Sequence, residues 1–420
     1  MVIFSIGSEF VVAVAVFLTL RMVAGRTGAV GFGAYSIARR TLAVITYPLL
    51  LGLYTSLPRY LARSDAEDSS AEQRRNLIVA ALAVAAPVLT AFVVTTLSLP
   101  GQVAIILFGS ASFRGLVGPL VLATIGLYLH TLVYAYYRGR LRMWTAGSMQ
   151  VLNLAVVPPV AVLVGGASID HVLIITGTGW VLAAAGFGLP ALLELGPFGR
   201  HPLRDASESI RELLRFGVPR LPGEVALFGL FALPTVLVAH TSGVAAAGFL
   251  SFGLALVQGI SSIFVPVGTL MLPYISRLAA RREWPRIRNL VTISLLGSVA
   301  TALVLVVLLE LVLGEAVRAL LGDRFAAAVE PARWLLAGAV GYQGYILLRN
   351  PLDALFVHPH NSVNLTIALL LMTAMIWFGG RIVRPDIAVF MSLTLVGALS
   401  YVSWRRGFDG LSNPTERTRT

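Results

Sequence analysis

Residues 28–58 read GAVGFGAYSIARRTLAVITYPLLLGLYTSLP, and residues 243–273 read GVAAAGFLSFGLALVQGISSIFVPVGTLMLP. The second stretch repeats the first at an offset of 215 positions. The identities include Gly28/Gly243, Gly33/Gly248, Ser36/Ser251, Ile45/Ile260, Leu57/Leu272 and Pro58/Pro273. The same offset places Glu9 on Glu224 and Gly126 on Gly341, so the repeat extends beyond this stretch. The chain is therefore predicted to consist of two related halves.

The composition is that of a membrane protein. Hydrophobic residues make up 57% of the chain and charged residues only 12%, whereas soluble globular domains carry roughly 25% charged residues. A half-length repeat in so apolar a chain is typical of transporters built from two helical bundles. Cysteine is absent, which excludes disulfides and zinc–thiolate sites. The net charge of +12 comes from arginines between apolar stretches, so we expect no nucleic-acid partner.

Twelve stretches of about 20 apolar residues are each long enough to cross a bilayer. They lie near residues 3–24, 35–58, 76–97, 116–137, 145–165, 171–194, 222–240, 244–272, 289–313, 332–352, 362–380 and 385–404. The repeat offset relates the spans of the second half to those of the first. We therefore predict an all-α integral membrane protein, with twelve transmembrane helices in two parallel-related six-helix bundles around a central cavity. The predicted bundles comprise residues 1–209 and 210–420.

The arginines predict the orientation. The loops after even-numbered spans and the C-terminal tail, which lie on one side of the membrane, carry 22 arginines. The loops on the opposite side carry 10. Because cytoplasmic loops are enriched in Arg and Lys, both termini are predicted to be cytoplasmic, in a multi-pass protein of the cell membrane. The loop that joins the halves contains residues 205–215, which we expect to form an amphipathic helix along the membrane surface.

Four arginines lie against this bias, at the outer end of the first two spans: Arg21, Arg26, Arg39 and Arg40. One interpretation is that they reach the outer lipid headgroups by snorkelling. The other is a cationic vestibule for an anionic substrate headgroup, since a charge within a span is costly unless it faces water or a partner. Arg39 and Arg40 are predicted to lie deepest.

A second group of candidates lies on spans 4 and 10. His130 and Tyr134 are one helical turn apart, and the offset places them on Tyr345 and Arg349. Equivalent helices of two related bundles are expected to face each other across the cavity. We therefore predict that these four residues bind substrate. An internal ion pair of Arg349 with Asp353 is the structural alternative.

Glu9 and Glu224 are candidates for ion coupling, by binding a proton or Na⁺. Each also lies near a helix N-terminus, where a carboxylate is stabilised without any role in transport. We expect no metal site, although His358 and His360 are two residues apart, and no cofactor. The chain has no phosphate-binding loop of the P-loop type, so it is not expected to hydrolyse ATP.

Three segments carry a resemblance to a known family. Gly31-Phe-Gly-Ala-Tyr-Ser-Ile-Ala-Arg-Arg40, with Leu57-Pro-Arg-Tyr-Leu-Ala62, and residues 321–334 resemble the polysaccharide flippases of the multidrug/oligosaccharidyl-lipid/polysaccharide exporter (MOP) superfamily. The loop of residues 59–75 does not match the motif of the major facilitator family. The resemblance implies two six-helix bundles that flip an isoprenoid-linked oligosaccharide, and cavity cations that meet its pyrophosphate. Arg39 and Arg40 match those cations by position, whereas their counterparts in the repeat are Leu254 and Ala255.

The resulting prediction is a non-enzymatic flippase. It would translocate an isoprenoid (pyro)phosphate-linked oligosaccharide for surface polysaccharide or glycoprotein assembly, as a monomer among membrane lipids, with glycosyltransferases or a polymerase of the same pathway as partners. An ion-coupled multidrug exporter of the same superfamily is the alternative. A membrane-embedded glycan polymerase or ligase has less support, because residues 98–115, the first sizeable external loop, contain no Asp or Glu.

Overall fold

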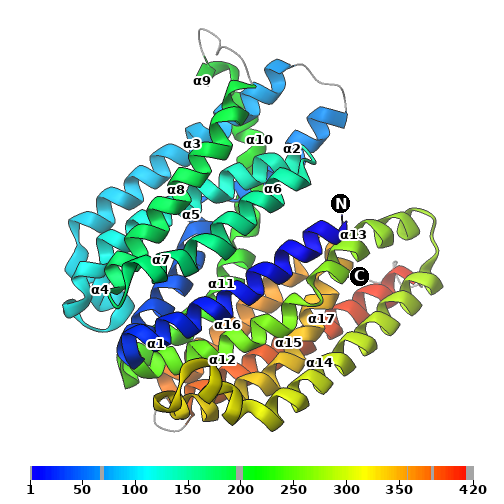
Figure 1. Cartoon of the computed structure of the whole chain (residues 1–420). Coiled ribbons are helices and arrows are strands. Elements are labelled where there is room, and N and C mark those ends of the chain that lie inside the picture. The colour runs from blue at the N-terminus through cyan, green and yellow to red at the C-terminus, as the bar shows by residue number, and fades with distance from the viewer. Residues whose placement is uncertain (1, 67–70, 195–201, 357, 380–382, 413–420) are drawn as a thin grey trace. The chain divides into compact units, whose positions relative to one another are not determined.

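The computed structural model describes residues 2–66, 71–194, 202–356, 358–379 and 383–412, and every regular element in these ranges is a helix (Figure 1). Ten helices among the described residues are long and apolar enough to cross a membrane. The predicted all-α membrane fold is therefore confirmed. By packing, the chain divides into two compact units, Met1–Phe228 with Ser242–Ala245 and Gly229–Thr241 with Ala246–Thr420.

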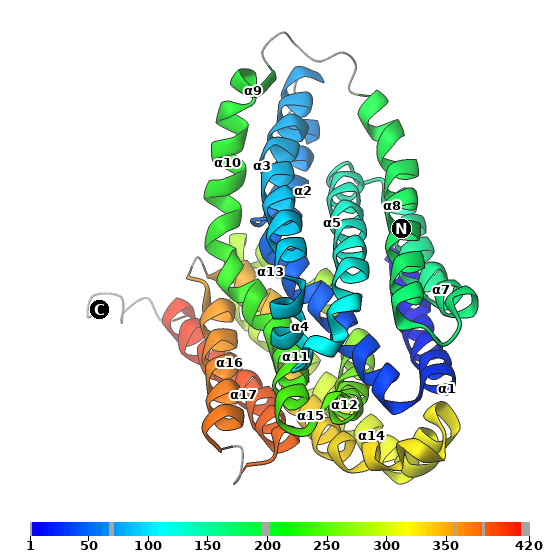
Figure 2. The ribbon, with the colours of Figure 1, turned by 90° about the vertical axis from the view of Figure 1, so that its left-hand side faces the viewer.

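The first unit contains the helices of the N-terminal half. They are α1 (Val2–Leu49), α2 (Leu53–Ala66), α3 (Ala71–Ser98), α4 (Pro100–Phe108), η1 (Ala111–Leu116), α5 (Val117–Gly139), α6 (Met143–Gln150), the π-helical η2 (Val151–Val156), α7 (Val157–Gly165), α8 (Ile169–Leu193), α9 (Pro202–Asp205), α10 (Ser207–Gly217) and η3 (Val218–Arg220). Figure 2 shows α3, α5 and α8 side by side, with α5 in the middle. Helix α5 packs most closely on α8.

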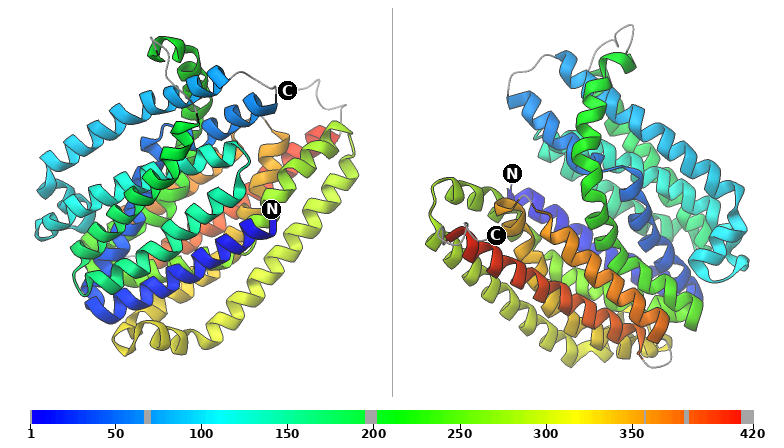
Figure 3. Two further views of the ribbon diagram at one scale, coloured as in Figure 1. Left: turned by 45° about the horizontal axis from the view of Figure 1, so that its top comes forward. Right: turned by 180° about the vertical axis from the view of Figure 1, so that it is seen from behind.

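The second unit contains most of α11 (Leu221–Ser242) and the helices that follow. These are α12 (Val244–Ser262), α13 (Val265–Ala280), α14 (Trp284–Leu321), η4 (Asp323–Ala328), α15 (Val329–Leu355), α16 (His360–Gly379) and α17 (Pro385–Ser412). Helix α15 packs against α13, α14 and α17. The 38-residue α14 extends along the outside of this unit (Figure 3). Each of the twelve predicted spans falls on one helix or on consecutive helices. Helix α15 is not among the ten helices that are apolar enough to cross a membrane, because its polar residues lower its mean hydropathy.

The repeat is visible in the backbone at Gly28 and Gly243. Gly28 breaks α1 with φ 71° and ψ −173°, and Gly243 separates α11 from α12 with φ 88° and ψ 166°. This left-handed, extended conformation is accessible to glycine because it has no Cβ. The two glycines therefore make equivalent breaks, each between the first and second span of its half.

Both halves also interrupt their second span near a proline. In the first half, α1 ends just after Pro48, and Leu51 and Gly52 take positive φ before α2 begins. In the second half, residues 263–264 separate α12 from α13. Pro48 and Pro266 lie at these breaks, because proline cannot continue the backbone hydrogen-bond ladder.

A second repeated glycine allows close helix packing in each unit. A Cβ on Gly126 of α5 would lie 2.7 Å from the Trp180 Cβ and 2.8 Å from the Gly177 carbonyl oxygen on α8. A Cβ on Gly341 of α15 would lie 2.6 Å from the Thr394 Cα on α17. The offset of 215 thus reproduces the same tight helix–helix contact.

The linker helix differs from the prediction. Residues 207–217 do form the helix α10, but α10 packs on α2 and α3, where its Leu213 is fully buried. At its end, Gly217 approaches the backbone of Gly52 so closely that a Cβ on either would overlap the other. The apolar face of α10 therefore packs on other helices. An amphipathic pattern is compatible with this, because a helix can bury one apolar face against protein as well as against lipid.

Candidate functional site

A cavity of about 250 Å³ lies inside the first unit, bordered by α1, α5, η2, α7 and α8, and Arg39 is its charged residue. Arg39 lies eleven residues beyond the break at Gly28, which corresponds to about 16 Å along the helix. That distance is about half the thickness of a ~30 Å hydrocarbon core. Arg39 therefore lies well inside its helix, away from the break at Gly28.

The surroundings of the Arg39 guanidinium are poor in compensating groups. Its Nε is buried and has no hydrogen-bond partner among the described residues. None of the described residues that line the cavity is Asp or Glu. The hydroxyls of Thr19 and Thr176, which also line it, donate at 2.7 Å to carbonyls of their own helices. Among the described lining residues the site thus offers a cation without a carboxylate, which favours an anionic ligand.

A hydrogen-bonded group borders this cavity. The Asn153 Nδ2 and the His130 Nδ1 are 2.8 Å apart, and the indole N–H of Trp180 donates to the Asn153 carbonyl oxygen. Asn153 is held there by the π-helical turn η2, in which the backbone is wider than in an α-helix. Trp180 also lines the cavity. His130, predicted as a site residue, therefore belongs to a buried polar cluster that reaches the cavity through Trp180.

The other predicted residues of this unit have different surroundings. The Tyr134 ring stacks on His130 with centroids 6.0 Å apart, so the two share a face of α5 as expected. Arg40 is buried, with 5% of its side chain exposed, but it does not line the Arg39 cavity. Arg26 donates from Nη1 to the carbonyls of Val162 (2.6 Å) and Leu163 (2.9 Å), and so caps the end of α7.

Arg21 is exposed on α1, so the structure does not bring it to the Arg39 cavity. The four arginines of the predicted vestibule thus divide by position. Arg39 alone lines the cavity, Arg40 is buried elsewhere, Arg26 holds a helix end, and Arg21 lies at the surface of its helix.

Of the two ion-coupling candidates, Glu9 and Glu224, only Glu224 has its side chain in the described part of the structure. Glu9 lies on α1, and its side chain is outside the described part of the structure. Glu224 lies in the first turn of α11 with one carboxylate oxygen buried. One turn further, the ring of Phe228 stacks on Tyr47 at 4.1 Å. Glu224 is thus held at a helix N-terminus beside an aromatic cluster, which stabilises a carboxylate.

In the second unit, Tyr345 and Arg349 lie on α15. Tyr345 is 1% exposed and its ring lies 5.5 Å from that of Tyr342, whereas Arg349 is exposed. Between the two tyrosines, Gln343 is fully buried, and neither of its amide atoms has a hydrogen-bond partner among the described residues. Asp353 accepts a hydrogen bond from Asn361 at 2.8 Å. That Tyr345 and Arg349 face His130 and Tyr134 stays a prediction.

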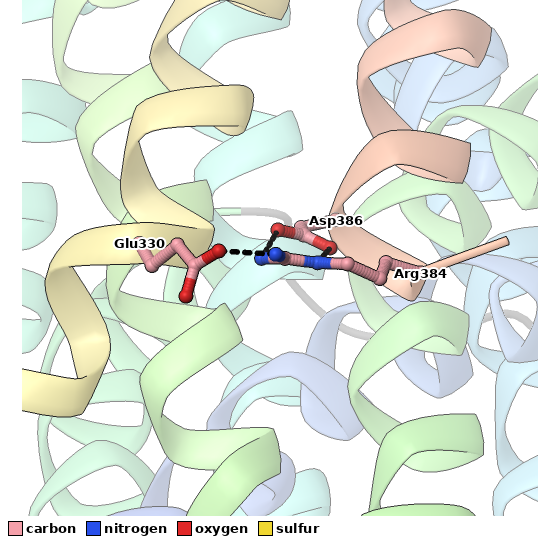
Figure 4. Close-up of polar contacts among 3 residues, drawn as sticks. All are labelled: Glu330, Arg384 and Asp386. Atoms are coloured by element: carbon pink, nitrogen blue, oxygen red, sulfur yellow. Dashed lines mark hydrogen bonds and ion pairs between the residues drawn. The ribbon is translucent and has the colours of Figure 1, made fainter.

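A charged network ties two helix starts together in the second unit. Arg384 donates from Nη2 to Asp386 at 2.6 Å and from Nη1 to Glu330, so it joins the start of α17 to the start of α15 (Figure 4). These two hydrogen bonds raise the pKa of Arg384. Only 4% of the Asp386 side chain is exposed, so this network is structural.

Three residues of the first unit were missed by sequence reasoning. All three are single polar or amphipathic residues in apolar spans. The tertiary structure brings Thr176 and Trp180 to the Arg39 cavity and Asn153 to His130. The spacing of Thr176 and Trp180, four residues apart on one helix, was a usable signal. Pro158 and Pro159, which follow the π-helical turn that presents Asn153, are a second signal, because proline cannot donate to the carbonyls of the preceding turn.

Comparisons with known proteins bear on the fold. No family model and no curated protein matches the sequence. A multidrug resistance MATE family transporter of the MOP superfamily, in an inward-facing conformation, superposes with a TM-score of 0.74 at 11% identity, over 96% of this chain and 95% of that chain. The lipid II flippase MurJ, in an inward closed conformation, gives a TM-score of 0.74 at 14% identity, over 98% and 90%.

A third similar structure comes from Pyrococcus furiosus. It is a MOP superfamily transporter whose binding pocket is described as reversed in polarity, and it superposes with a TM-score of 0.65 at 13% identity. The alignment covers 98% of this chain and 96% of that chain. At such identities the likeness establishes the fold alone. This chain is a multi-pass membrane protein with the fold of the MOP superfamily transporters.

Proposed function

We propose that this protein is a flippase that moves an isoprenoid (pyro)phosphate-linked oligosaccharide across the cytoplasmic membrane by alternating access. The observation that carries the proposal is the guanidinium of Arg39, buried in a cavity whose described lining has no carboxylate. A phosphate supplies the missing anion and accepts hydrogen bonds from a guanidinium in a bidentate geometry. Neutral substrates leave this charge uncompensated.

Each candidate residue has a distinct role in this proposal. Arg39 binds the phosphate, and Arg40 adds positive charge one residue further along α1. The His130–Asn153 pair offers hydrogen bonds to sugar hydroxyls, and the ring of Tyr134 offers a stacking surface. Tyr345 and Arg349 of the second unit contact the same headgroup as the two units rock. Glu224, with Glu9, couples the cycle to an ion gradient.

The competing function is multidrug export, which the MATE transporters with this fold favour. Export of organic cations calls for an acidic or aromatic cavity, because a buried positive charge repels a cationic drug. Arg39 has the opposite sign, which supports the anionic lipid. A membrane-embedded polymerase or ligase has no comparable observation in its favour.

The test is translocation in proteoliposomes. Vesicles carry a polyprenyl-pyrophosphate-linked oligosaccharide in one leaflet, and its appearance in the other is followed by lectin binding. We expect Arg39→Ala with Arg40→Ala to lower the rate to that of protein-free vesicles, with membrane insertion unchanged. Arg318→Ala is the control, since this exposed arginine pairs only with neighbouring acids at the end of α14.

Two outcomes contradict the proposal. One is a double variant that translocates the lipid at the wild-type rate, which removes the assignment of these arginines. The other is wild-type protein that leaves the lipid in place but transports an organic cation such as ethidium, which establishes drug export instead.

A further inference from the structure

A second cavity in the first unit, of about 530 Å³, is almost wholly apolar. Its lining residues come from α3, α5 and α8, which lie side by side in Figure 2, and from Leu57 of α2. Helix α8 leaves room there because it presents Ala184, Ala185, Gly186 and Gly188. Leu82 and Leu189 at the lining are 42% and 59% exposed, so the groove opens to the side that faces lipid.

The groove spans one leaflet. Its lining on α8 runs from Val181 to Leu192, about 16 Å along the helix axis, and one leaflet contributes roughly 15 Å of hydrocarbon. On α5 the lining runs from Leu129 to Tyr136, in the half of the helix that ends at the turn to α6. On the predicted orientation this is the cytoplasmic leaflet.

The end of the groove at this turn is charged. Arg142 donates to Glu194 at 2.6 Å, and the hydroxyl of Tyr136, which lines the groove, lies 3.4 Å from the same carboxylate. The hydrogen bond from Arg142 lowers the pKa of Glu194, and the charges of Arg142 and Arg140 lower it further. Two cations thus surround one carboxylate, so the end of the groove carries a net positive charge.

The groove is separate from the Arg39 cavity but shares its walls. Trp180 borders the Arg39 cavity, and the adjacent Val181 borders the groove. On α5, Leu127 borders the cavity and Leu129 the groove. The pair α5–α8 therefore has a polar cavity on one face and an apolar groove on the other.

We propose that this groove binds the isoprenoid chain of the lipid substrate as the lipid is taken up, with its phosphate at Arg140 and Arg142 before the phosphate moves to Arg39. The apolar wall, the depth of one leaflet and the cationic end coincide, and they match an amphiphile with one long chain and an anionic head. The assignment rests on the proposed function, because that function requires the chain to stay in the membrane while the headgroup is carried.

A photo-crosslinking experiment tests the groove directly. The probe is a polyprenyl monophosphate with a diazirine on its last isoprene unit, added to the full-length protein in phosphatidylcholine vesicles. We expect the label on the α8 peptide that contains Ala185 and Leu189, and competition by unlabelled polyprenyl monophosphate. Equal competition by phosphatidylglycerol overturns the proposal, because the groove is then a site for the acyl chains of any anionic lipid.

Filling the groove should abolish the label. A Cβ on Gly186 meets no atom within 4 Å, so Gly186→Leu places a side chain in the groove without displacing the backbone. We expect labelling to fall by about tenfold. The matched control is Gly297→Leu on α14, a helical glycine whose Cβ also meets nothing within 4 Å and which lies outside the groove. Unchanged labelling in Gly186→Leu overturns the proposal.

The cationic end is tested by Arg140→Gln. Loss of one interfacial cation should weaken labelling by about fivefold, and an undiminished signal places the phosphate elsewhere. Arg318→Ala should leave labelling unchanged, because this exposed arginine lies on α14 and does not line the groove. If the proposed function is wrong, translocation is absent while crosslinking in the groove is unchanged. If the groove is assigned wrongly, the α8 peptide is not labelled while translocation is unchanged.

Discussion

The imidazole of His130 and the amide of Asn153 are joined by a 2.8 Å hydrogen bond that links α5 to the π-helical turn η2. Both side chains are buried, at 5% and 0% exposure. The carbonyl oxygen of the same Asn153 accepts from Trp180 on α8. One residue therefore connects three helices at the edge of the Arg39 cavity, and a buried polar link of this kind stabilises a unique packing.

Asn153→Leu should destabilise the protein by about 1–3 kcal/mol, because it leaves a buried imidazole nitrogen of His130 without its partner. Thermal unfolding in detergent measures the change. The double variant His130→Phe with Asn153→Leu should recover part of the loss, since it removes both polar partners. If the two single effects add without coupling, the hydrogen bond contributes nothing.

Gly126→Ala and Gly341→Ala should each destabilise their unit by roughly 1–3 kcal/mol, because the new Cβ overlaps the facing helix. Gly118→Ala, also on α5, is the control: its Cβ meets no atom within 4 Å, and we expect a neutral or slightly stabilising effect. Melting temperatures of the three variants make the comparison. Equal effects at Gly118 and Gly126 would show that helix propensity, rather than packing, governs both.

The Arg142–Glu194 pair predicts a pH dependence. The folded-state pKa of Glu194 is lowered, so the pair contributes stability above the unfolded pKa of about 4.3 and loses it as the pH falls through the folded value. Both side chains are 41% exposed, so the contribution stays below about 1 kcal/mol. The difference in melting temperature between wild type and Glu194→Gln should be constant from about pH 7 to 5 and shrink below about pH 4. A difference that instead grows on acidification refutes the assignment.

Arg384→Gln should destabilise the second unit by roughly 1–3 kcal/mol, because Asp386 is almost fully buried and loses its charged donor (Figure 4). Arg318→Gln is the control, since Arg318 and its partner Glu315 are both exposed and such pairs contribute little. Chemical unfolding followed by tryptophan fluorescence compares the two. Similar losses of unfolding free energy in both variants would show that Arg384 contributes no more than an exposed ion pair.

The sequence alone determined the architecture. Apolar stretches of bilayer length specify helices, because a lipid-exposed backbone must satisfy its hydrogen bonds internally. The offset of 215 aligned Gly28 with Gly243, and the structure has equivalent backbone breaks at these two glycines, since positive φ is a local property of glycine. A proline lies near the break in each second span. The twofold organisation followed from these local signals.

Only the tertiary structure decided which polar residues meet. The sequence grouped four arginines and placed Arg39 and Arg40 deepest, yet of the four Arg39 alone lines the cavity, and Arg26 holds the end of α7. The linker helix α10 had the pattern of a surface helix but is packed on α2 and α3. Its apolar face is compatible with lipid or protein, and only the fold supplies the neighbour. Asn153 meets His130 because a π-helical turn shifts the register of its span, and only the fold places α5 opposite that turn.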